Sequence, residues 1–68
     1  MIQAAFLSHG DFILTRGGSV GMVLRKDVGR GTATVRFDGD KRETVIACTF
    51  IDRVTTNMTH VNEWRAVA

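Results

Sequence analysis

Residues 15–32, TRGGSVGMVLRKDVGRGT, hold five of the seven glycines of the 68-residue chain. Two interpretations are open for this stretch: a glycine-rich loop that holds a phosphate, or the turns of a small sheet. A phosphate loop needs Gly-x-x-x-x-Gly-Lys-Ser/Thr or Gly-x-Gly-x-x-Gly, and each string opens a helix. Neither string is present, and Gly29-Arg30-Gly31 leads into a strand-like run. The stretch therefore predicts turns, with Gly29 and Gly31 at positive φ in a hairpin.

Short runs rich in Val, Ile, Thr and Phe alternate with Gly and Asp clusters, and this pattern predicts strands. The runs span residues 10–16, 19–25, 32–38, 42–50 and 51–54. Five short strands are too few for a two-sheet sandwich, and closure into a barrel would remove exposed edges. The sequence therefore predicts a mainly β fold, a small five-stranded barrel over residues 10–54, with a segment at 1–9 that packs on it.

Alternation along these runs predicts which side chains enter the core. Ala33, Val35 and Phe37 share the inner face of their strand. The first two strands are apolar on both faces, because Ile13 and Val23 point inward while their neighbours point outward. We call these outward neighbours the outer apolar set: Phe12, Leu14, Met22 and Leu24. The set must be covered by the N-terminal segment, by the C-terminal tail or by another subunit.

The tail at residues 55–68 departs from the strand pattern. Met58, Val61, Trp64 and Ala68 recur at helical spacing. Asn57 precedes them and is suited to cap a helix N-terminus. The tail is therefore predicted to be a C-terminal extension of one or two helical turns.

Basic residues gather at two of the predicted loops. The formal net charge of +2 permits contact with nucleic acid without demanding it. We expect a phosphate-contacting rim made of Arg25, Lys26, Arg30, Lys41 and Arg42, with Arg16 and Arg36 as weaker candidates. Such a rim would neutralise phosphates without reading sequence. Acidic residues lie between these cations, so ordinary solvated loop charge stays open as the alternative.

Two stretches resemble known domains. Residues 10–24 resemble the opening of KOW-type and Tudor-like domains among the SH3-like barrels, through Gly10-Asp11, Ile13, Gly17-Gly18 and Gly21-x-Val23. Residues 29–54 are similar to the second half of the Tudor-like domain that ends certain bacterial DNA-repair helicases. The matching positions are Val35-Arg36-Phe37, Lys41 or Arg42, and Ile51-Asp52-Arg53-Val54. The resemblance implies an SH3-like barrel that works with nucleic acid or with proteins that handle it.

The chemistry of the remaining side chains indicates no enzyme. Ser8 and His9 are adjacent, so their side chains need not face each other as a nucleophile and base do. Cys48 lies in an apolar run, which is typical of a small buried hydrophobe. The chain also resembles a plasmid-encoded dihydrofolate reductase family in its Gly-Asp opening and at residues 44–54. It lacks the Val-Gln-Ile-Tyr string that lines the pore of that family.

Metals, cofactors and membranes are not expected either. Cys48, His9 and His60 lack the close spacing of zinc ligands. The single cysteine allows no intramolecular disulfide and fits a reducing, cytoplasmic setting. No run approaches membrane-spanning length, and the first residues lack the basic region of a signal peptide.

The residues and the resemblance together predict a non-enzymatic interaction module. Its partner is expected to be nucleic acid or a nucleic-acid-handling protein complex, bound through the basic loops. The alternative is a homo-oligomeric structural or inhibitor protein that binds another protein through the outer apolar set.

Overall fold

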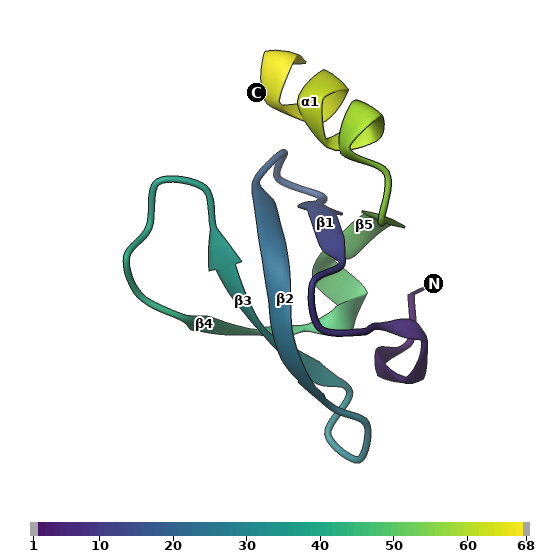
Figure 1. Cartoon of the computed structure of the whole chain (residues 1–68). Coiled ribbons are helices and arrows are strands. Elements are labelled where there is room, and N and C mark those ends of the chain that lie inside the picture. The colour runs from purple at the N-terminus through teal and green to yellow at the C-terminus, as the bar shows by residue number, and fades with distance from the viewer. Residues whose placement is uncertain (1, 68) are drawn as a thin grey trace.

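Five antiparallel strands form one open sheet in the computed structural model, which describes residues 2–67 (Figure 1). The strands are β1 (Phe12–Thr15), β2 (Val20–Asp27), β3 (Thr32–Phe37), β4 (Thr44–Ala47) and β5 (Ile51–Thr55). Two short 3-10 helices, η1 (Ala4–Phe6) and η2 (Cys48–Phe50), and a C-terminal helix, α1 (Met58–Val67), complete the chain. The predicted mainly β fold with five strands and a helical C-terminal extension is confirmed.

The sheet has the strand order β4-β3-β2-β1-β5 and does not close into the predicted barrel. Within residues 2–67 no ladder joins β4 to β5. The run at 42–50 was expected to be one strand, but its last three residues turn the chain as η2. The Cys48 N–H donates to the Gly31 carbonyl and fastens the end of β4 to the β2–β3 hairpin. Beyond η2 the chain pairs with β1 as β5, so both edge strands stay open.

The core lies on the inner face of the sheet. Ile13, Val23 and Val35 are fully buried there, which confirms the inward faces predicted from alternation. Ala4 and Leu7 from the N-terminal segment, with Cys48 and Ile51, complete this cluster. The first nine residues therefore supply side chains that a sheet of this size needs to bury its inner face.

The helix α1 packs against β2 and β5 and lies over the end of the sheet away from the β2–β3 hairpin (Figure 1). Val61 of the helix is fully buried and Val20 of β2 nearly so, and neither belongs to the inner core. Val20 lies opposite Leu14, a member of the outer apolar set. The Arg65 guanidinium lies 5.8 Å from the centroid of the Phe12 ring. Of the three covers considered for the outer apolar set, the C-terminal tail is therefore the one that covers part of it.

The helix begins as the sequence predicts and extends further than expected. The Asn57 Oδ1 accepts the Thr59 N–H at 2.9 Å, which is the predicted N-cap. The helix then runs for 10 residues instead of one or two turns. Isolated helices of this length are marginal in water. Packing of Val61 on the sheet, with the bidentate contact of Arg65 to Asp38 at 2.7 and 3.0 Å, stabilises the additional turns.

Two glycines show where the turn chemistry was predicted correctly and where it was not. Gly31 has φ of 66° and lies in the turn of the β2–β3 hairpin, as expected, whereas Gly29 does not have positive φ.

Gly21 is needed for a different reason, because a Cβ there would lie 3.0 Å from the Arg36 carbonyl and 3.0 Å from the Phe37 ring. Close approach of β2 to β3 therefore excludes a side chain at Gly21.

Gly21→Ala should destabilise the domain by about 1–3 kcal/mol, because the new methyl group meets backbone that cannot move without breaking the ladder. Gly29→Ala is the matched control, since its Cβ would meet nothing closer than 3.6 Å. We expect Gly29→Ala to lie within about 0.5 kcal/mol of the parent protein. Urea unfolding of both variants measures the difference, and equal stabilities would contradict the close approach.

Asp38→Asn should loosen α1, because it removes the charge that holds Arg65. The ion pair is half-exposed, so the expected effect is small: amide exchange in α1 about two-fold faster, with the inner strands unchanged. Asp40→Asn is the control, because Asp40 lies in the same loop and makes no ion pair in the described part of the chain. Hydrogen exchange that is the same in both variants would show that Asp38 does not anchor the helix.

Candidate nucleic-acid interface

A bulge in β2 positions the basic residues at the hairpin end of the sheet. Val23 pairs with Val35 and Arg25 pairs with Thr34, so Leu24 is the additional residue. Beyond a bulge the alternation of faces shifts by one residue. Lys26 consequently lies opposite Ala33 on the inner face of β3, while Arg25 lies on the outer face. The side chains of Arg25 and Lys26 thus leave the hairpin on opposite faces of the sheet.

Three of the five predicted rim cations line one hollow at this hairpin. We call it the hairpin hollow. It has a volume of about 270 Å³ and is lined by Arg25, Lys26, Asp27, Arg30, Thr32, Thr34 and Val45. The cations are exposed, and Arg30 is held only loosely by Asp27, at 3.8 Å. Two threonines supply hydroxyl groups beside the cations, and such hydroxyls donate to phosphate oxygens.

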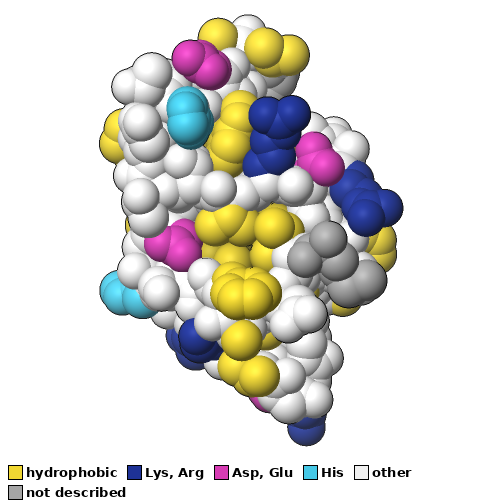
Figure 2. Space-filling view, turned by 90° about the vertical axis from the view of Figure 1, so that its right-hand side faces the viewer, with side chains coloured by type: hydrophobic (Ala, Val, Ile, Leu, Met, Phe, Trp, Pro, Cys, Tyr) yellow, Lys and Arg dark blue, Asp and Glu magenta, His cyan; other side chains and the backbone are white. Residues whose placement is uncertain are grey.

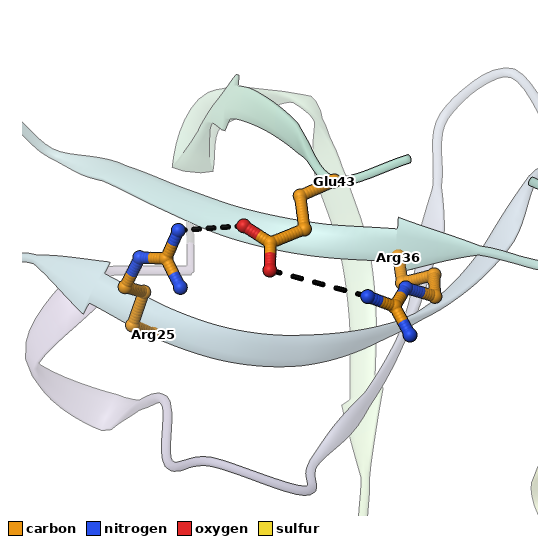
Figure 3. Close-up of polar contacts among 3 residues, drawn as sticks. All are labelled: Arg25, Arg36 and Glu43. Atoms are coloured by element: carbon orange, nitrogen blue, oxygen red, sulfur yellow. Dashed lines mark hydrogen bonds and ion pairs between the residues drawn. The ribbon is translucent and has the colours of Figure 1, made fainter. Parts of the chain in front are cut away.

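Glu43 restrains part of this charge. Its carboxylate lies between Arg25 and Arg36 on the outer face, 2.6 Å from the first guanidinium and 3.9 Å from the second (Figure 3). Both arginines therefore share a single negative charge. The outer face here keeps a net positive charge, with two arginine side chains aligned along β2 and β3.

The remaining predicted cations lie elsewhere. Lys41 and Arg42 belong to the β3–β4 loop, and Arg16 belongs to the β1–β2 turn. Both connections lie at the end of the sheet away from the β2–β3 hairpin, as Figure 1 shows. The six residues of β3 separate the two ends by roughly 20 Å at the usual strand rise. The structure thus brings together Arg25, Lys26 and Arg30, and it does not bring Lys41 and Arg42 to them.

The outer apolar set is half-buried at all four positions, Phe12, Leu14, Met22 and Leu24. The Arg65 guanidinium covers the Phe12 ring, and α1 lies over neighbouring Val20. A second hollow of about 480 Å³ remains beside the helix, with Leu14 and Trp64 in its lining. This groove is the part of the outer apolar set that a partner could still reach.

Exposed apolar side chains include Phe6, Val28 and Phe50, which are 73, 57 and 59% exposed. The sequence pattern offered Phe6 only as part of an N-terminal cover for the outer apolar set, and it did not single out Val28 and Phe50. Phe6 and Phe50 belong to the 3-10 helices η1 and η2, whose three residues are too short to give a periodic signal. Val28 follows the last residue of β2 within the hairpin. The only sequence signal for apolar surface at this hairpin was Val28, an apolar residue within a turn rich in Gly and Asp.

The remaining chemistry in the described residues is limited. No group of three or more His, Cys, Asp or Glu side chains within residues 2–67 could hold a metal ion. No helix in that range is both long and apolar enough to span a membrane. Burial raises the pKa of the Cys48 thiol, and the hydrogen bond to Asp38 raises the pKa of Arg65. Cys48 is therefore a packed, protonated side chain, and Arg65 stays charged.

Comparisons with protein-family models, with curated proteins and with solved structures find no match for this chain.

The Cys48 thiol should react far more slowly with a disulfide reagent in the native protein than in denaturant. Its folded pKa lies above its unfolded value, so the unfolded chain loses the proton first as the pH rises. Stability is then unaffected at neutral pH and falls once the pH passes the ordinary pKa of a thiol. Thiol labelling and urea unfolding from pH 7 to 10 measure both effects; fast native labelling would contradict burial of the thiol.

Proposed function

We propose that this domain is a non-enzymatic interaction module that binds the phosphate backbone of nucleic acid through the β2–β3 hairpin. The observation that carries the proposal is the clustering of Arg25, Lys26 and Arg30 around one hollow with two threonines. Cations and hydroxyls of this kind contact phosphate oxygens and leave the base sequence unread. A protein complex that handles nucleic acid is the wider setting in which such a module acts.

Two cations at the hairpin hollow are only loosely held. Arg65 contacts Asp38 at 2.7 Å, and Arg36 shares Glu43 with Arg25, whereas Arg30 meets Asp27 only at 3.8 Å. The Lys26 Nζ donates to the Ala5 carbonyl at 3.2 Å and forms no ion pair within residues 2–67. Arg30 has 84% of its side chain exposed. These two side chains are the ones best placed to approach a ligand.

We further propose that the sheet is an opened relative of the SH3-like barrels, of the KOW and Tudor-like type. The support is the strand order, in which β1 lies between β2 and the last strand, together with the positions of Gly10-Asp11 and Gly21-x-Val23. The buried Asp11 accepts the Ser8 N–H, so the Gly-Asp pair shapes the entry to β1. We assign Gly10-Asp11 a structural role and no part in binding a ligand.

Self-association through the outer apolar set is the second proposal. The hollow lined by Leu14 and Trp64 favours it, because apolar surface stays accessible beside α1. The exposed Val67 lies in the same lining. A homo-oligomer built there would use the face opposite the inner core.

Lys26→Ala with Arg30→Ala should weaken binding to a short DNA duplex about ten-fold at low salt, because two phosphate contacts are lost. The slope of log affinity against log salt should fall by about 0.9 for each cation removed. Fluorescence anisotropy at several salt concentrations measures both quantities.

Lys41→Ala with Arg42→Ala is the matched control, because it removes the same charge from the opposite end of β3. It should change affinity much less. Glu43→Gln should increase affinity, since it releases Arg25 and Arg36. Equal losses in the two double variants would show that binding follows net charge and that the hairpin is not the site.

A further inference from the structure

A third hollow lies on the other side of the same hairpin. We call it the N-terminal hollow. It has a volume of about 260 Å³ and is lined by Ile2, Gln3, Ala4, Ala5, Val28, Gly31, Cys48 and Thr49. One wall comes from the segment around η1 and the other from η2, while the hairpin closes the end. Most of its side chains are apolar, so the hollow differs from the polar hairpin hollow beside it.

Two exposed phenylalanines, Phe6 and Phe50, directly follow the lining residues Ala5 and Thr49 of this hollow. A 3-10 helix has three residues per turn, so residues i and i+2 point in different directions. Ala4 of η1 and Cys48 of η2 are buried in the core, which turns Phe6 and Phe50 outward. Each exposed ring is thus carried by a short turn whose first residue is anchored in the core.

Cations lie beside these rings. The Lys26 Nζ donates to the Ala5 carbonyl, the residue directly before Phe6, and Arg30 lies between the lining residues Val28 and Gly31. Figure 2 shows hydrophobic side chains gathered in a band down the face that holds β1, β5 and the N-terminal segment. Lys or Arg side chains lie beside and below the lower end of this band, at the hairpin end of the molecule. Hydrophobic side chains and cations therefore lie near one another at this end of the face (Figure 2), and Lys26 contacts the backbone next to Phe6.

We propose that the nucleic acid bound at this hairpin is single-stranded, with bases stacked on Phe6 and Phe50 and phosphates held by Lys26 and Arg30. The inference rests on the proposed function and names its ligand class. Aromatic platforms beside a basic surface are the arrangement that binds single strands without sequence preference, because every base has a π-face. In a duplex the base faces are stacked on one another, so they cannot stack on Phe6 or Phe50.

The other aromatic side chains are less exposed than Phe6 and Phe50. Phe12, Phe37 and Trp64 are each half-buried, and the Arg65 guanidinium lies over the Phe12 ring. Val28, at 57% exposed, extends the apolar surface between the rings and the hairpin cations. A strand lying along this surface would place its bases toward η1 and η2 and its backbone toward Lys26 and Arg30.

The test compares a fluorescent 12-nucleotide oligothymidylate with a 12-base-pair duplex, using the whole chain. Phe6→Ala and Phe50→Ala should each weaken single-strand binding by about five-fold or more and leave duplex binding unchanged. Phe6→Leu keeps the apolar bulk without the ring and should lose nearly as much. Met58→Ala is the matched control, because Met58 is an exposed apolar side chain, 45% exposed, at the start of α1 and outside both hollows of the hairpin. Unchanged urea midpoints establish that the variants are folded.

The outcomes separate the two proposals. If Lys26→Ala with Arg30→Ala weakens both ligands while the phenylalanine variants weaken neither, the hairpin binds phosphate and the single-strand inference is wrong. If the parent protein binds neither ligand at low salt, both proposals fail. If the phenylalanine variants convert a dimer to a monomer by light scattering and leave oligonucleotide affinity unchanged, the surface is a contact between copies of the chain and the inference is overturned.

Discussion

The strands β1 and β2 carry apolar side chains on both faces, and the rest of the structure depends on covering both. A domain of 68 residues buries only about 60% of the surface that its unfolded chain exposes, so it cannot leave one face of its central strands bare. The inner face is closed by Leu7 and the other core residues, and the outer face receives α1. The buried Val61, with the contact from Arg65 to Asp38, holds a helix that is too short to persist alone.

The placement of the helix decides which surface remains for a ligand. It lies at the end of the sheet opposite the β2–β3 hairpin, as Figure 1 shows. At the hairpin end, the bulge at Leu24 sends Arg25 to the outer face and Lys26 toward η1. Cations consequently lie on both sides of one turn, next to the threonines on one side and next to the backbone that precedes Phe6 on the other. A regular strand would have placed Lys26 on the outer face, away from Phe6.

The faces of β1, β2 and β3 could be predicted because burial imposes a two-residue period that survives in the sequence, and the Asn57 cap could be predicted from its local chemistry. Closure of the sheet could not, because it depends on where η2 directs the chain and no residue pattern fixes that direction. The bulge in β2 could not be predicted from the sequence either, because Leu24 fits the pattern of an ordinary outward-facing strand residue. Of the five cations expected to form a rim, Lys41 and Arg42 lie at the other end of β3. Phe50 was missed, and Phe6 was considered only as part of the N-terminal segment expected to cover the outer apolar set, because a three-residue turn has no period.

We propose that the hairpin and the two short 3-10 helices form one binding surface. An amide chemical-shift titration with the oligothymidylate tests this arrangement, because it reports each backbone position in the unmodified protein. We expect shifts to concentrate at residues 3–7, 25–32 and 48–50, while α1 and the β3–β4 loop stay unaffected. Shifts that concentrate at α1 and β1, or that are absent at low salt, would contradict it.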